Sequence, residues 1–210
     1  MDYEASYFKK RFQEILDSLG WFLLKECSKC KRKVKISILD GQCPSCKETA
    51  IPGKLYPNIC EIYQELFVDA IHGCMDEEMK MKRKGDYRPY FIRVYTSLET
   101  FLCRVAEGQM RKKHINSKVV SFIFDNMRPD VGLYFELLDS LDVKVGKKDK
   151  AFIEGLRKIQ KMRNIVVHKA EYPSKEQVLE AFEKIAKVFS ILCAYSIFTK
   201  KRKIGPAEWV

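Results

Sequence analysis

The chain has 210 residues, enough for one domain of ordinary size with a small appendage but not for two large domains. Apolar residues make up 46% of the sequence and aromatic residues 12%, which excludes a wholly disordered chain. Lys and Arg outnumber Asp and Glu by 39 to 28, and the resulting net charge of +11 favours an anionic partner such as nucleic acid or a membrane surface.

The sequence predicts a cytoplasmic protein without a membrane partner. Charged residues interrupt every apolar stretch before it reaches the roughly 18 residues that a membrane span needs. The first residues, from Met1 to Ala5, lack the basic and then apolar layout of a secretory signal. In a reducing compartment, the eight cysteines are more typical of metal ligands or buried thiols than of disulfides.

The N-terminal part predicts one helix followed by a small β module. Within residues 1–20, the apolar positions from Tyr7 to Leu19 follow helical spacing, and Gly20 is a natural end. Residues 21–52 predict the β module, with a first strand at 21–24 and a second, alternating strand at 34–38. We place a linker at 51–53, where Pro and Gly follow one another.

The rest of the chain predicts helices. Pro57 fits the first turn of a linking helix within residues 53–89. Asn116 or Ser117 suits the start of a short helix, and Ser174 with Gln177 three residues later has the spacing of a capping box. The expected helices downstream are 90–110, 118–126, 133–141, 151–168 and 174–192, which lie in a helical domain over 90–199, followed by a basic tail at 200–210.

Two pairs of cysteines predict a structural zinc site. The pairs are Cys27 with Cys30 and Cys43 with Cys46, and each pair has the short spacing that lets two thiolates reach one ion. Four protein ligands leave no open position for an activated water, so we expect one structural Zn²⁺ per chain without a role in catalysis. Unliganded cysteines in a loop are the alternative.

Three polar residues near the end of the helix expected over 151–168 form a candidate active site. Asn164 and His168 are four residues apart and share a face, while Arg163 lies about 100° around the helix from Asn164. Arg offers a planar cation for a phosphate, and His transfers protons near neutral pH. The alternative is a histidine that favours the helix dipole beside an arginine in a surface ion pair.

The segment Arg163-Asn164-x-x-x-His168, followed by a short break and a long closing helix, resembles the signature of the HEPN family (higher eukaryote and prokaryote nucleotide-binding domains). The helix from Tyr90 to Met110, with Glu99 in Ser97-Leu98-Glu99-Thr100-Phe101-Leu102, is similar to the first core helix of that family. The resemblance covers about 90–199. It implies a mainly α, antiparallel helical bundle that forms a homodimer, with two copies of the motif facing each other.

Many HEPN members are metal-independent endoribonucleases that act in defence or toxin systems. The resemblance implies that Arg163 binds the scissile phosphate, that His168 moves a proton of the 2′-hydroxyl or the leaving oxygen, and that Asn164 orients the site. The resemblance also implies that Glu99 is the acidic residue of the family's core helix and belongs to the site. The alternative for Glu99 is a structural ion pair. Further implied partners are RNA and an inhibitory or activating protein.

Two hypotheses about function follow. The first is a HEPN-type endoribonuclease with an added zinc ribbon, which cleaves RNA through the 2′-hydroxyl. The second is a non-catalytic adaptor that binds nucleic acid or protein through the ribbon and uses the bundle as a dimerisation platform. In both, basic side chains contact the partner; these are Lys161, Lys169, Lys29, Lys31, Arg32 and Lys33, although a solvated basic face is the alternative for the ribbon.

Overall fold

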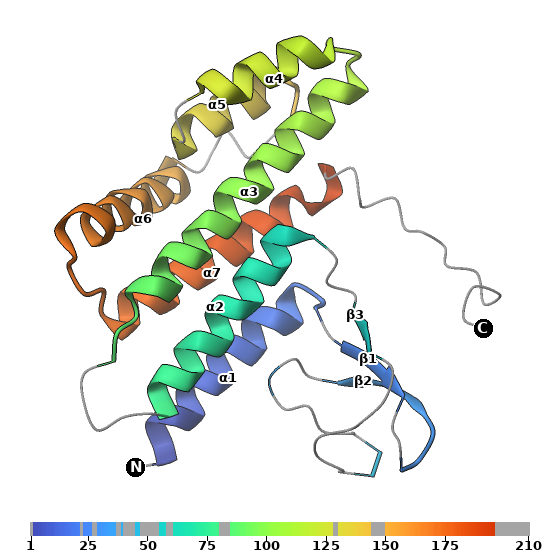
Figure 1. Cartoon of the computed structure of the whole chain (residues 1–210), viewed down its shortest axis with the longest axis vertical. Coiled ribbons are helices and arrows are strands. Elements are labelled where there is room, and N and C mark those ends of the chain that lie inside the picture. Colours follow the sequence, from blue (N-terminus) through green and yellow to red (C-terminus); the bar gives the residue numbers. More distant parts are fainter. Residues whose placement is uncertain are drawn as a thin grey trace.

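The computed structural model describes residues 2–21, 23–26, 29–36, 39, 45–46, 55–57, 61–79, 85–127, 130–143 and 150–195. These residues form seven α-helices, a final 3-10 turn and three short strands, so the mainly α prediction is confirmed (Figure 1). The helices are α1 (Asp2–Ser18), α2 (Ile62–Met79), α3 (Arg88–Lys112), α4 (Ser117–Asn126), α5 (Val131–Ser140), α6 (Lys150–Lys169) and α7 (Lys175–Leu192), with η1 at Cys193–Tyr195. The strands are β1 (Leu23–Glu26), β2 (Lys33–Ile36) and β3 (Leu55–Pro57).

The long helix α3 is the element on which the bundle is built. Its buried residues recur from Phe91 to Met110, so it is covered along nearly its whole length. In Figure 1, α1, α2, α3 and α7 run side by side, and the neighbouring pairs among them pack together. Helices α5 and α6 pack on each other and on α3, and α4 packs near the C-terminal end of α3. The second group therefore attaches to the first mainly through α3, and α6 also packs on α7.

A cluster of aromatic rings joins the helices of the first group. The ring centre of Phe189 on α7 lies 4.8 Å from that of Phe101 on α3 and 5.3 Å from that of Phe67 on α2. It lies 5.7 Å from the ring of Trp21, which follows α1. Such pairs add about 0.5–1.5 kcal/mol each to the free energy of burial. The cluster thus ties segments that are far apart in the sequence.

Polar side chains define where several helices begin. The side chain of Asn116 accepts the Lys118 N–H at 2.8 Å, and so begins α4. At the start of α7, Ser174 accepts the Gln177 N–H at 3.3 Å while the Gln177 side chain accepts the Ser174 N–H at 2.7 Å. This reciprocal pair is the predicted capping box, which is confirmed together with the Asn116 cap.

The strands form a sheet with the order β2-β1-β3, in which both pairs are antiparallel. The third strand was not predicted: Pro57 pairs with Leu23, and α2 begins only at Ile62. The expectation that Pro57 lies in the first turn of a helix is therefore wrong. Because β3 is an edge strand, its proline need not donate a ladder hydrogen bond. The sheet consequently extends past residue 52.

A buried carboxylate joins the end of α2 to the starts of α3 and α7. The side chain of Glu78 is only 4% exposed, forms an ion pair with Lys175 and accepts the Tyr87 hydroxyl hydrogen bond at 3.0 Å. Burial raises the pKa of Tyr87, with the Glu78 hydrogen bond adding to the shift. These contacts fasten the end of the bundle at which α3 begins.

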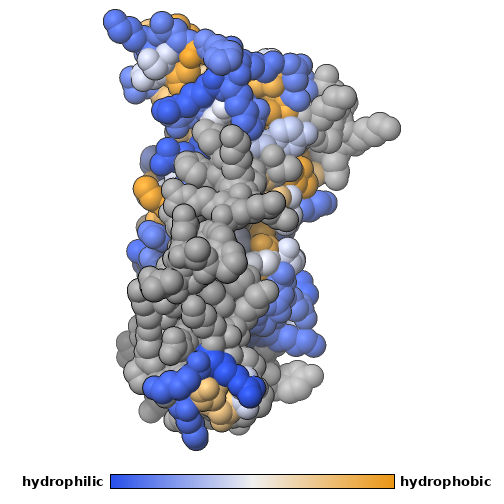
Figure 2. All heavy atoms as spheres, turned by 90° about the vertical axis from the view of Figure 1, so that its right-hand side faces the viewer, coloured by the Kyte–Doolittle hydropathy of each residue, from blue (hydrophilic) through white to orange (hydrophobic). Residues whose placement is uncertain are grey.

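On the face that Figure 2 shows, the described surface is mostly hydrophilic, with smaller hydrophobic groups between the hydrophilic side chains. In the part of the chain that the structure describes, no helix combines the length and the apolar character needed to cross a membrane.

The aromatic cluster makes a testable prediction about stability. Replacing Phe189 with Ala should lower the free energy of unfolding by about 3–5 kcal/mol, because the ring is buried among four other rings and leaves a cavity. Ile191→Ala on the same helix should cost less than about 1 kcal/mol, since Ile191 is exposed. Urea unfolding measures both. Equal losses for the two variants would contradict this account.

Candidate active site

Helix α6 carries Asn164 and His168 on one face, and Arg163 lies further around the helix. Leu156, Ile159 and Val166 are buried and hold the helix against the bundle. Arg163 is half-buried, whereas Asn164 and His168 are exposed. The Nη1 atom of Arg163 donates a hydrogen bond to the Asn164 side-chain oxygen at 3.2 Å. The neighbouring residue of the motif therefore helps to orient the arginine.

Arg163 faces α3 from across the α3–α6 contact. Its guanidinium carbon lies 5.7 Å from the centre of the Tyr95 ring, which is buried. Glu99 follows Tyr95 by four residues and so lies on the same side of α3, one turn further along. A cation over an aromatic face contributes about 0.5–2 kcal/mol, more when it is shielded from water.

The charge of Arg163 acts on a half-buried carboxyl group. Burial raises the pKa of Glu99, and the positive charge of Arg163 lowers it to a smaller extent. Burial also raises the pKa of Tyr95, with the charge of Glu99 adding to the shift. Burial, Cys103 and Glu99 together raise the pKa of Tyr134 on α5 to about 12. Both phenols are therefore protonated at neutral pH.

Two polar atoms in this contact are buried without a hydrogen-bond partner. They are Tyr95 Oη and Arg163 Nε, and no other described side chain has such an atom. Leaving a buried donor or acceptor unpaired costs about 1–3 kcal/mol. Native proteins contain few such groups, and they call for a specific explanation such as a functional role. Both unpaired atoms lie in the contact between Arg163 and Tyr95. This contact is therefore the candidate active site.

Helix α5 is fixed to α6 just before Arg163. The Gln160 side chain donates to Asp130 Oδ2 at 3.2 Å and accepts the Val131 N–H at 3.3 Å. Asp130 in turn accepts the Leu133 N–H at 3.1 Å and begins α5. Gln160 lies one turn before Arg163, so these hydrogen bonds also fix the backbone that carries the arginine.

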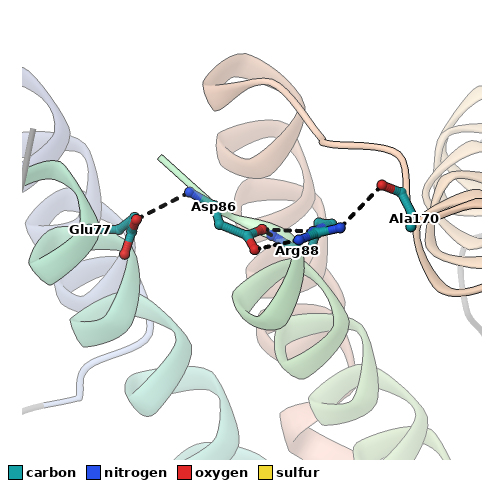
Figure 3. A network of polar contacts seen from close by, with 4 residues as sticks. All are labelled: Glu77, Asp86, Arg88 and Ala170. Carbon is teal, nitrogen blue, oxygen red and sulfur yellow. Dashed lines mark hydrogen bonds and ion pairs between the residues drawn. The ribbon is translucent and has the colours of Figure 1, made fainter. Parts of the chain in front are cut away.

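The C-terminal end of α6 is held by the start of α3 (Figure 3). Arg88 donates to the carbonyl oxygen of Ala170 at 3.3 Å and forms an ion pair with Asp86 at 2.7 Å. The Asp86 N–H donates to Glu77 on α2 at 3.2 Å, which extends the network to a third helix. The hydrogen bond from Arg88 lowers the pKa of Asp86. This network anchors the turn that follows His168.

His168 lies in the last turn of α6, apart from the contact of Arg163 with α3. Its side chain is exposed, and among the described residues no hydrogen bond or ion pair joins it to another side chain. The structure therefore brings Arg163, Asn164 and Glu99 together within one chain, but it does not bring His168 into the same contact.

The predicted nucleic-acid contacts fall into two places. Lys161 and Lys169 are exposed on α6, the helix that carries the motif. Lys29, Lys31 and Arg32 are exposed in the turn between β1 and β2. Lys33 begins β2, and its side chain lies outside the described set.

The predicted zinc ligands are only partly within the described residues. Cys30 and Cys46 are half-buried, while Cys27 and Cys43 lie outside the described residues. Glu26 pairs with Lys33, so β1 and β2 form a hairpin, and Cys30 lies in a turn between the two strands. Over the described ranges, no group of three or more metal-ligating side chains is found. The zinc site therefore stays a prediction.

Sequence reasoning missed two contributors to this site. The spacing of Tyr95 within α3 is that of a residue on its apolar face, yet Tyr95 also lies four residues before Glu99 and so on the same side of the helix. Arg88 gave no such signal, because its contact with Ala170 joins residues that lie far apart in the sequence.

A groove of about 500 Å³ between α1 and α7 lies outside the motif. Its lining combines the apolar side chains of Tyr7, Phe8 and Leu179 with charged residues such as Arg11 and Glu183. None of its lining residues belongs to the predicted site, and the ion pair of Arg11 with Glu183 crosses from one helix to the other. We assign the groove no role in the proposed chemistry.

Comparisons with family models, with curated proteins and with solved structures find no match for this chain. The resemblance to the HEPN family therefore rests on the residues of the chain itself.

The half-buried carboxyl group makes a prediction about pH. Because the folded-state pKa of Glu99 is raised, its contribution to stability is fully present below the unfolded pKa of about 4.3 and is lost as the pH rises through the folded value. Glu99→Gln, which keeps the side chain neutral, should therefore gain stability relative to the wild type as the pH rises above about 4 toward neutrality.

Urea unfolding across that range measures the difference in free energy of unfolding. Glu136→Gln at an exposed position of α5 is the matched control and should show a constant difference. A constant difference for Glu99→Gln as well would contradict the assignment of Glu99 to a buried site.

Proposed function

We propose that this chain is a metal-independent endoribonuclease of the HEPN type. The observation that carries the proposal is the placement of Arg163 beside Glu99 and Tyr95, with Tyr95 Oη and Arg163 Nε buried and unpaired. The motif arginine, the polar residue after it and the acidic residue on the core helix are the elements that the resemblance assigns to the reaction. Their proximity in this chain supports the proposal.

In the proposed reaction, Arg163 binds the scissile phosphate. Its guanidinium is always charged and presents donors in a planar fork, which suits the non-bridging oxygens of the phosphate. Glu99 and Asn164 hold the arginine in place, because one supplies a nearby negative charge and the other accepts a hydrogen bond from Nη1. Arg163 then stabilises the extra negative charge that develops on the phosphate oxygens during attack.

His168 moves the protons. One histidine removes the proton of the 2′-hydroxyl, whose oxygen attacks phosphorus, and a second protonates the departing 5′-oxygen. The P–O5′ bond breaks as the P–O2′ bond forms, which leaves a 2′,3′-cyclic phosphate and a 5′-hydroxyl end. DNA lacks the 2′-hydroxyl and is therefore no substrate.

A homodimer would supply the two histidines. His168 and the 43% exposed Val167 lie next to each other at the end of α6, where a second copy could cover the valine and bring its own His168 to the phosphate. The proposed chemistry requires a site shared between two chains. Within one chain, a single exposed His168 that lies away from Arg163 does not complete the site.

The zinc ribbon belongs to the proposal as a capture module. Cys27, Cys30, Cys43 and Cys46 would hold one Zn²⁺, which would supply structural stability to a sheet of three short strands. The exposed cations Lys29, Lys31 and Arg32 in its hairpin turn would contact phosphates.

Metal analysis tests the ribbon. The purified protein should contain one zinc ion per chain, and Cys43→Ser should lower that content, because the site loses one of four ligands. Cys193→Ser, at an exposed position on η1, is the matched control and should retain the metal. A protein without zinc, or equal zinc in both variants, would contradict the ribbon.

Kinetics of site variants test the nuclease. His168→Ala and Arg163→Lys should each lower the cleavage rate of single-stranded RNA by about 100-fold or more in the presence of EDTA. The first removes the proton transfer, and the second removes the planar fork. His72→Ala changes an exposed histidine on α2 and should cleave as the wild type does. A requirement for added Mg²⁺ in cleavage, or equal rates in the His168 and His72 variants, would overturn the proposal.

The second candidate is the adaptor without catalysis. The observation that favours it is the separation of exposed His168 from Arg163 within one chain, since Arg163 could then serve only to neutralise Glu99. This reading predicts RNA or protein binding that is equal in wild type and His168→Ala, without cleavage by either.

A further inference from the structure

Helix α4 presents an apolar face to solvent. Phe122 is 67% exposed and Val119 is 48% exposed, whereas Val120 on the opposite side is buried. Among the described elements, α4 packs on α3 alone. Exposure of most of a phenylalanine side chain to water is unfavourable, so a contact that covers this face would be stabilised by burial.

A cation shares the helix face of the exposed Phe122 ring. Lys118 and Phe122 are four residues apart and Val119 and Phe122 three, so the three side chains share one face of α4. Lys118 is exposed and has no ion pair among the described residues.

Further cations lie where α3 ends, directly before α4. Arg111, Lys112 and His114 are exposed, and His114 has a φ of 58°, which turns the chain from one helix toward the next. Arg111 is partly neutralised by Glu107 at 2.5 Å. At the top of Figure 2, which is the end of the molecule formed by α4, α5 and the end of α3, hydrophobic patches lie between strongly hydrophilic ones.

We infer that this end of the molecule binds single-stranded RNA, outside the proposed active site. The α4 surface consists of Arg111, Lys112, His114, Lys118, Val119 and Phe122. Single-stranded nucleic acid is held by cations that follow the backbone and by aromatic rings on which bases stack, and the α4 surface combines both. A second copy of this chain fits less well, because it would bring two clusters of the same positive charge together.

The inference rests on the proposed function, since the α4 surface would capture the substrate of that same site. Tyr95 and Lys112 lie on the one helix α3, about 25 Å apart at its rise of ~1.5 Å per residue. An RNA of several nucleotides could therefore contact both places, whereas a dinucleotide could contact only the active site.

Binding of a fluorescent 2′-O-methyl oligonucleotide of about 12 nucleotides tests the α4 surface. This probe cannot be cleaved through the 2′-hydroxyl, so fluorescence anisotropy reports affinity alone. Phe122→Ala should weaken binding about tenfold, while Phe122→Trp should retain it because the indole also stacks. Tyr7→Ala removes an exposed aromatic ring from α1 and is the matched control, which should bind as the wild type does.

The dependence of affinity on salt tests the cations. Replacing both Lys112 and Lys118 with Ala should reduce the slope of log K against log salt by about 1.4, since each phosphate contact to a single strand contributes about 0.7. An unchanged slope would overturn the electrostatic part of the inference.

Cleavage of a dinucleotide and of a long RNA distinguishes the two proposals. Slower cleavage of the long RNA by Phe122→Ala, with equal cleavage of the dinucleotide, would support the α4 surface. Wild-type affinity in Phe122→Ala, or a change in its oligomeric state by sedimentation, would overturn the α4 surface and leave the nuclease standing. Failure of the wild type to cleave either RNA, with probe binding still dependent on Phe122, would overturn the nuclease alone.

Discussion

The packing of α6 against α3 places Arg163 beside the half-buried carboxyl group of Glu99, and the proposed site depends on this contact. The charge of the arginine offsets part of the cost of burying the carboxylate, while burial still dominates and raises the pKa of Glu99. The Tyr95 ring lies on the same side of α3 and adds a favourable face for the cation. A phosphate that binds Arg163 would enter an environment already arranged around a positive charge.

The remaining polar networks fix the two helices that form this contact. Gln160 ties α6 to the start of α5, and Arg88 ties the end of α6 to the start of α3. At the same end of the bundle, buried Glu78 holds α7 through Lys175. Preorganisation of this kind matters for catalysis, because donors held in place need not reorganise as charge develops. The exposed His168 is the part of the motif that these networks leave open to a second chain.

Local features of the fold could be predicted from the sequence, because side chains such as Asn116 and Ser174 specify helix starts through hydrogen bonds to nearby backbone. Pro57 could not be placed, since its fixed φ suits both a first helical turn and an edge strand. Only the family resemblance predicted that Glu99 lies near Arg163. The two residues are far apart in the sequence and are brought together by the packing of α6 on α3, which no local sequence pattern specifies. Tyr95 could not be predicted as a site residue, because hydrophobic periodicity treats its ring as apolar and gives no information about its hydroxyl.

End-group analysis of RNA products formed in EDTA, compared with those from the same sequence carrying a single 2′-deoxy nucleotide at the cleaved position, tests the central claim most directly. The account predicts 2′,3′-cyclic phosphate and 5′-hydroxyl ends from the all-ribose strand and no cleavage at the 2′-deoxy position. Cleavage that persists at that position, or products with 5′-phosphate ends, would contradict attack by the 2′-hydroxyl and with it the proposed roles of Arg163 and His168.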